Sequence, residues 1–146
     1  MYRTCSVLIV LFVTGCGGGR APPVEFVVPK EFTGPIWIVL DPNGQEIPLV
    51  GDRFQVVIPA DGVLRVQTFQ PFDRWHQSYA RYDDGSVLRE MSGDSPDGPQ
   101  TLALRGGVSA VTRRGGIEIR WISFFVGTAK EYGERPAMDF PPGVDR

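Results

Sequence analysis

The chain has 146 residues, of which 42% are apolar and 22% are charged, and it contains 18 glycines and 13 prolines. This content of Gly and Pro excludes a coiled coil or a helical repeat array, and the apolar fraction excludes a wholly disordered chain. The length allows one domain with its own core, and a formal net charge of -2 argues against a nucleic-acid partner.

The N-terminus has the proportions of a secretory signal. Arg3 precedes an apolar run at residues 7–13, which is too short for a spanning helix of about 20 residues. Residues 13–16 read Val-Thr-Gly-Cys and resemble the bacterial lipobox. The resemblance implies that residues 1–15 are removed as a signal peptide and that Cys16 becomes the first residue and carries a diacylglyceryl thioether. The alternative is an ordinary secretory signal with a chance cysteine.

The residues after the lipobox predict a tether. Residues 16–23 contain three glycines followed by Arg, Ala and two prolines, a flexible and then stiff composition. Gly17 stands where an Asp commonly retains lipoproteins at the inner membrane, so we expect an outer-membrane location. Since Cys5 leaves with the signal and Cys16 carries lipid, no thiol remains for a disulfide, thiolate catalysis or zinc.

Strand patterns begin directly after the tether. Residues 24–28 are β-branched and aromatic and end at a proline. Residues 36–40 are apolar without alternation, which indicates a strand buried on both faces. Residues 41–44, Asp-Pro-Asn-Gly, predict a turn.

Two alternating segments follow. In residues 53–58, Phe54, Val56 and Ile58 share one face, and residues 63–68 alternate in the same way. A tight turn at residues 59–62 separates them, so we expect the two segments to pair as a hairpin.

The second half of the chain holds the longest apolar run. Strands are predicted at residues 77–82, 101–104, 108–111 and 117–126, and a loop at residues 92–99. In the last strand, Ile117, Ile119, Trp121 and Phe125 share one face, and the opposite face becomes apolar towards the C-terminal end. That end is expected to be covered on both sides. Trp37 and Trp121 are predicted core residues.

Residues 128–132 alone suggest a helix, with Thr128 and Glu131 spaced as a capping box. A Pro-rich tail follows at residues 135–146. Short strands with turn signals about every 8–12 residues predict an all-β fold. We expect a single antiparallel β-sandwich over residues 24–134, immunoglobulin-like or transthyretin-like, with at most one short C-terminal helix.

Three segments together resemble a family of small bacterial lipoproteins that carry a domain of unknown function. These are the Val-Pro, Phe and Gly opening at residues 26–35, the Ile-Pro-x-x-Gly-Val-Leu motif at 58–64, and the Phe-Phe-Val-Gly-Thr motif at 124–128. The likeness covers residues 24–132. It implies a lipid-anchored β-domain and carries over no activity and no catalytic residue.

His76 is the only histidine and the residue from which any acid–base or metal chemistry would start. No serine of the chain lies in a Gly-x-Ser-x-Gly elbow, which disfavours a serine hydrolase. The favoured interpretation is a loop histidine beside aromatic residues, namely Phe69, Phe72, Trp75 and Tyr79. We therefore predict no catalytic residue, no metal site and no cofactor.

Arg74, Trp75, His76 and Tyr79 form the predicted binding patch, because Arg, Trp and Tyr are typical of interaction surfaces. The leading hypothesis is a lipid-anchored envelope lipoprotein that acts as a non-catalytic binding or assembly module. It would hold the membrane through Cys16 and take an envelope protein or a glycan as partner. Two alternatives remain: an envelope hydrolase or metal-dependent enzyme that uses His76, and a glycan- or peptidoglycan-binding module that stacks sugars on Trp75 and Tyr79.

Overall fold

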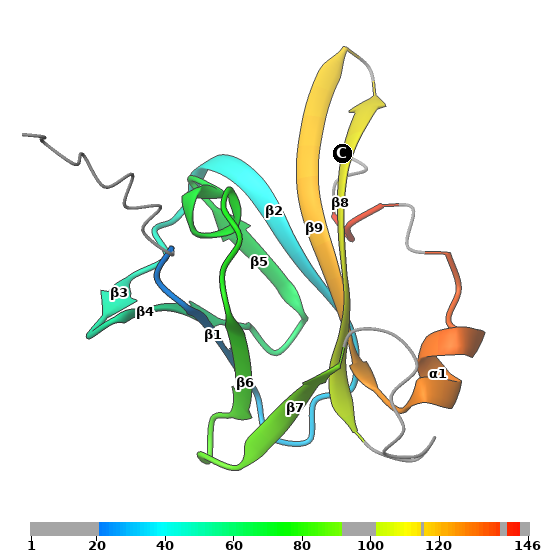
Figure 1. Ribbon diagram of the computed structural model, residues 1–146. Helices are drawn as coiled ribbons and strands as arrows, with labels where there is room; N and C mark the ends of the chain where they lie inside the picture. The colour runs from blue at the N-terminus through cyan, green and yellow to red at the C-terminus, as the bar shows by residue number, and fades with distance from the viewer. Residues whose placement is uncertain (1–20, 92–101, 115, 138–139, 144–146) are drawn as a thin grey trace, which may run out of the picture.

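The computed structural model describes residues 21–91, 102–114, 116–137 and 140–143. Its strands form one curled sheet (Figure 1), in the spatial order β3-β4-β1-β6-β7-β8-β9-β2-β5. The strands are β1 (Val24–Val28), β2 (Gly34–Gln45), β3 (Leu49–Val50), β4 (Arg53–Val57), β5 (Val63–Val66), β6 (Ser78–Tyr82), β7 (Val87–Met91), β8 (Ala103–Arg114) and β9 (Ile117–Gly127). A 3-10 turn (Gln70–Phe72) precedes β6, and helix α1 (Ala129–Glu134) follows β9.

The prediction of a mostly β chain with one short helix is confirmed, but the antiparallel sandwich is not. The strand pairs β1–β4, β1–β6, β2–β5 and β7–β8 are parallel, and the other pairs of the described sheet are antiparallel. A single sheet can enclose a core when its twist and curl bring its own inner face around on itself, so a second packed sheet is not required here.

The inner face of this sheet carries one continuous core. Alternate residues of each strand point inward, as the period of two requires. The fully buried inner side chains include Phe26, Ile36, Ile38, Leu64 and Val126. Side chains from strands near both ends of the sheet therefore pack together in this core, and this packing stabilises the curled shape of the sheet.

Strand β2 is buried on both faces, as its uniform apolar run predicts. Ile36 and Ile38 belong to the inner core, whereas Trp37 and Val39 form a second cluster with Trp121 on the other face. The rings of Trp37 and Trp121 lie 5.0 Å apart, edge to face, and each side chain is only 4% exposed. The prediction that both tryptophans are core residues is confirmed.

The predicted hairpin of residues 53–58 with 63–68 is wrong. The turn between them exists, since the Gly62 N–H donates to the Pro59 carbonyl at 2.9 Å. The two strands instead pair with different neighbours, since β4 lies parallel to β1, and β5 lies parallel to β2 at the other end of the sheet order. Alternation determines which face of a strand is buried but does not determine its neighbour.

The predicted turn at residues 41–44 is a bulge within β2. Pairing with β5 breaks between Leu40 and Gln45, and the Asn43 N–H donates to Asp41 Oδ1 at 2.9 Å. A Cβ on Gly44 would lie 2.5 Å from the Val66 backbone nitrogen, so only glycine fits this close approach.

The predicted strand pieces near residues 101–111 belong to one long strand, β8, which pairs with β9 as a hairpin and carries a bulge between Gly106 and Val108. Strand β2 pairs with β9 only between Val126 and Trp121, so the outer half of the hairpin projects beyond the sheet (Figure 1). Ile117 lies on this projecting part and is 66% exposed, although it shares one face of β9 with the buried Trp121. The other end of β9 is covered on both sides, as predicted.

Helix α1 begins with the predicted capping box. The Glu131 N–H donates to Thr128 Oγ1 at 3.2 Å, and the Thr128 N–H donates to Glu131 Oε2 at 2.8 Å. Tyr132 packs against Phe125 of β9, with ring centroids 6.0 Å apart. The predicted loop at residues 92–99 lies outside the described residues.

Candidate functional site

The residues of the predicted binding patch occupy three different surroundings. They lie on the loop that leaves the 3-10 turn and on the start of β6. Trp75 lines a cavity at the N-terminal end of the domain, His76 lines a second cavity, and Tyr79 lies on the outer face of the sheet.

Trp75 is 73% exposed and borders an open cavity of about 440 Å³. The other lining residues are Ala21, Pro22, Pro23, Leu49, Asp52 and Gln77. Two hydrogen bonds hold the entering chain here, from the Val24 N–H to the Gln77 carbonyl at 2.9 Å and from the Phe54 N–H to the Pro23 carbonyl at 2.8 Å. We call this space the N-terminal cavity, since the predicted tether enters the domain at its wall.

His76 lies beside an aromatic ring, as expected. Its ring is 5.8 Å from that of Phe72, and its Nδ1 lies 2.8 Å from the Arg74 carbonyl oxygen. In the neutral imidazole this contact places the hydrogen on Nδ1 and leaves Nε2 as the acceptor.

A cavity of about 250 Å³ adjoins the histidine, and we call it the His76 cavity. Its lining residues are Phe72, His76, Gly107, Ser109, Ile122 and Phe124. A histidine and a serine hydroxyl therefore share one apolar space, but no Asp or Glu is among the described lining residues. Within the described part of the chain, no group of three or more His, Cys, Asp or Glu side chains could hold a metal ion. The His76 cavity therefore holds a histidine that could act as the general base of a catalytic triad, but its described lining has no carboxylate to orient that histidine.

Tyr79 belongs to a polar cluster on the outer face of β4, β1 and β6. Strand register places Tyr79, Glu25 and Gln55 in one row across these strands. Glu25 Oε1 lies 3.6 Å from Arg53 Nη1, and Glu25 Oε2 lies 3.3 Å from Arg81 Nε. The Arg53 guanidinium also lies over the Tyr79 ring at 4.7 Å.

We call Glu25, Arg53, Gln55, Tyr79 and Arg81 the outer Arg–Glu cluster. It holds two guanidinium groups for one carboxylate, and Asp52 provides a second, more exposed partner to Arg53 at 3.6 Å. Sequence reasoning found Tyr79 but missed its neighbours. Their association depends on parallel pairing of β1 with both β4 and β6, which no local pattern of the sequence reveals.

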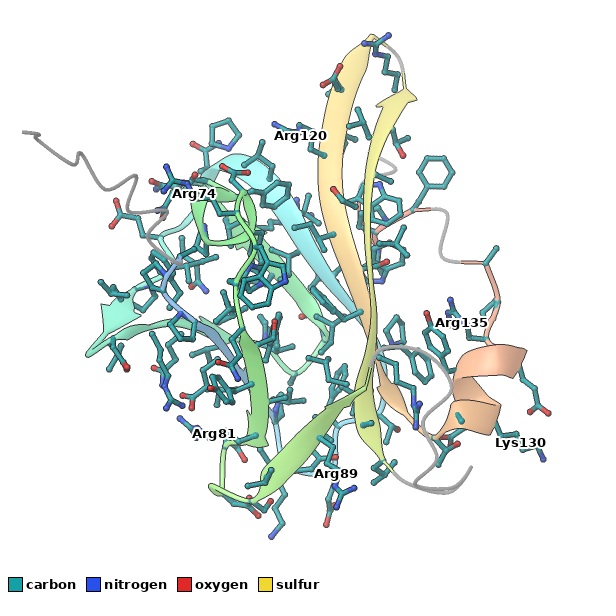
Figure 2. The ribbon with its side chains drawn as sticks, viewed as in Figure 1. Arg74, Arg81, Arg89, Arg120, Lys130 and Arg135 are labelled. Carbon is teal, nitrogen blue, oxygen red and sulfur yellow. The ribbon has the colours of Figure 1, made fainter. Side chains whose placement is uncertain are left out.

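Arg74 is exposed on the loop before β6. Figure 2 shows it at the opposite end of β6 from Arg81, pointing away from the strands. Arg74 is therefore separate from the outer Arg–Glu cluster, and the four predicted patch residues do not form one continuous site.

Comparison with known proteins finds no matching family model and no matching curated protein. A crystal structure of a protein from Bacillus anthracis, named a "Putative Lipoprotein", is similar to this chain with a TM-score of 0.48 and 14% identity. The similarity covers 85% of this chain and 87% of that one. Within the described residues, no helix is both long enough and apolar enough to cross a membrane.

Proposed function

We propose that this protein is a lipoprotein of the bacterial cell envelope, anchored by lipid on Cys16, and that its β-domain is a non-catalytic module that binds another envelope component. The observation that carries the proposal is the lipobox-like Val-Thr-Gly-Cys at residues 13–16, followed by a Gly- and Pro-rich tether. Two or more acyl chains on one residue give stable attachment, because each buried CH₂ contributes about 0.8 kcal/mol. Gly17 supports an outer-membrane location.

The anchor is tested with the full chain produced in a bacterium. We expect the wild-type protein to fractionate with membranes and to carry a lipid mass on Cys16, whereas Cys16→Ala abolishes both. Cys5→Ala is the matched control, since it removes the other cysteine but leaves the lipobox intact, and it should behave as wild type. A Cys16→Ala chain that keeps its mass increment and its membrane fraction would refute the anchor. Density-gradient separation of the membranes then tests the outer-membrane location.

The outer Arg–Glu cluster is the proposed contact surface of the module. Tyr and Arg are the residue types that dominate binding energy at protein interfaces. Arg81 shares the Glu25 carboxylate with Arg53, whose second carboxylate partner is Asp52, so an acidic segment of an envelope protein that pairs with Arg81 is the partner that the cluster fits.

A photo-crosslinking amino acid at position 79 tests this contact in cells. We expect capture of one reproducible envelope protein, with reduced capture in the Arg81→Gln variant. The control places the same group at Val87, which is 83% exposed at the start of β7, and this position should capture no protein in common with position 79. Identical captures from both positions, or none from position 79, would remove the proposed surface.

The two alternatives receive less support from the geometry. Sugar stacking on two rings is disfavoured because Arg53 already covers one face of Tyr79. Catalysis through His76 has a hydroxyl in Ser109 but no carboxylate among the described lining residues of its cavity. His76→Ala should therefore leave membrane anchoring and crosslinking from position 79 unchanged.

A further inference from the structure

The N-terminal end of the domain is apolar and exposed where the tether enters. Trp75 is 73% exposed, and Leu49 and Val50 of the short edge strand β3 are each 53% exposed. Pro23 lines the N-terminal cavity together with Leu49 and Trp75. We call Pro23, Leu49, Val50 and Trp75 the apolar end.

The tether is short, so lipid on Cys16 would keep the domain close to the bilayer. Cys16 lies five residues before Ala21, which lines the N-terminal cavity. Five residues extend at most about 18 Å, since each spans about 3.6 Å at full length. With lipid on Cys16, Ala21 at the N-terminal cavity is therefore held within about 18 Å of the bilayer surface, whatever the conformation of the tether.

We propose that the apolar end docks on the lipid bilayer, with the Trp75 indole at the level of the headgroups. The inference rests on the proposed lipid anchor and adds to it a fixed orientation of the domain. Trp is suited to this position, because its ring is apolar and its N–H finds polar partners at the interface. Because the anchor makes the contact intramolecular, even weakly favourable contacts suffice to keep it formed.

The charged residues around the apolar end indicate which lipid composition favours the docking. Asp52 lines the N-terminal cavity and is exposed, Arg53 follows it at the start of β4, and the exposed Arg74 precedes Trp75 on the loop before β6. Both signs are present, and Arg53 is already paired with Glu25 and Asp52. Contact with an uncharged phosphatidylcholine surface is thus favoured over one that depends on anionic lipid, and it should be insensitive to salt.

Tryptophan fluorescence measures this docking directly. The full lipidated protein is reconstituted in phosphatidylcholine vesicles, with or without bromine on the acyl chains near the headgroups. Trp37 and Trp121 are each 4% exposed, so quenching by bromine reports Trp75. We expect a blue shift of the Trp75 emission on reconstitution and its loss in brominated vesicles, at both low and high salt.

Two variants provide the controls. Trp75→Phe should remove the quenchable emission. Val87→Trp in the Trp75→Phe background places an exposed indole at the start of β7, which follows the other end of β6, and it should stay unquenched (Figure 1). The docking is overturned if the Trp75 emission is not quenched in brominated vesicles, or if the indole at position 87 is quenched to the same extent.

Vesicle flotation and the mass of Cys16 are measured on the same sample. A chain that floats with its lipid but shows no quenching overturns the docking alone and leaves the anchor intact. A chain without the lipid mass refutes the anchor, and with it the docking that rests on it. Quenching that appears only with anionic lipid overturns the proposed uncharged contact.

Discussion

Arg105 and Ser123 are the buried polar side chains of the described core strands, and they differ in their hydrogen bonds. Arg105 is 3% exposed, and its Nε donates to the Gly127 carbonyl oxygen at 3.0 Å. Ser123 is 2% exposed, and its Oγ has no hydrogen-bond partner among the described residues. Removing one partner of a buried hydrogen bond leaves the other group unsatisfied and costs stability, whereas removing a buried polar group that has no partner relieves a desolvation cost.

We therefore expect opposite outcomes from two substitutions. Arg105→Met keeps the apolar stem but leaves the Gly127 carbonyl without this donor, and should destabilise the fold by about 1–3 kcal/mol. Ser123→Ala removes an unsatisfied hydroxyl and should be neutral or slightly stabilising. Urea unfolding of both variants measures the difference. Equal losses of unfolding free energy would contradict this account of the two side chains.

Asp84 gives the fold a defined dependence on pH. Hydrogen bonds from the side chain and backbone of Ser86 hold the pKa of this carboxyl below its ordinary value, and Lys30 at 3.5 Å adds to the effect. A carboxyl whose pKa is lowered by folding stabilises the folded state above the unfolded pKa of about 4. This contribution is lost as the pH falls through the folded pKa.

Asp84→Asn tests this linkage. The variant should be less stable than wild type at pH 7, and the difference should shrink as the pH falls from about 5 towards 2, because the wild-type carboxylate becomes protonated. Thermal unfolding of both proteins across this pH range measures the change. A difference that is constant over the whole range would show that Asp84 acts through its shape and not through its charge.

The turn between β4 and β5 joins two strands that stand near opposite ends of the sheet order. Gly62 has φ of +75°, and a Cβ there would lie 2.6 Å from the Pro35 carbonyl oxygen. Its own carbonyl accepts the Trp37 N–H at 2.8 Å, which joins the turn to β2. This turn therefore starts the parallel pairing of β5 with β2.

Gly62→Ala should cost more stability than Gly51→Ala. Both glycines have positive φ, but a Cβ at Gly51 meets nothing within 4 Å, so only the backbone cost of about 1–2 kcal/mol applies there. At Gly62 the overlap with Pro35 is added to that cost, and Trp37 loses its acceptor if the turn shifts. The melting temperatures of the two variants test this. A Gly62→Ala protein as stable as Gly51→Ala would mean that the turn moves freely.

At the scale of strands, local sequence patterns predicted where the strands lie and which of their faces are buried, but not which strands pair with each other. The uniform apolar run of β2 indicated burial on both faces, and the Trp37–Trp121 contact confirms it. The alternation in β4 and β5 predicted their inner faces, yet a short turn favoured a hairpin that does not form. The outer Arg–Glu cluster stayed hidden for the same reason, since Glu25, Arg53 and Arg81 meet only through long-range parallel pairing.

At the scale of the whole molecule, the two ends of the described chain have different roles. The N-terminal end enters β1 beside the apolar end, where the proposed anchor would hold the domain to a membrane. The C-terminal segment turns back from α1 towards the sheet (Figure 1), and Pro141 is buried. A Cβ on Gly143 would lie 3.6 Å from Arg65 Nη2, so this segment reaches the outer face of β5.

That outer face carries the tryptophan cluster. Register places Arg65, Val39 and Trp121 in one row across β5, β2 and β9, with Trp37 beside it on β2. The C-terminal segment thus reaches the same row that holds the Trp37–Trp121 pair. We infer that residues after Arg135 help to shield this pair from water.

Ending the chain after Arg135 should therefore expose the pair. In a Trp75→Phe background, which removes the exposed indole, we expect a red shift of the remaining emission and stronger quenching by acrylamide. The matched control is the full chain with Trp75→Phe alone, in which Trp37 and Trp121 are each 4% exposed. Because the apolar end is distant along the chain from this segment, truncation should leave membrane fractionation unchanged. Emission identical to that of the control would show that the strands alone bury the two rings.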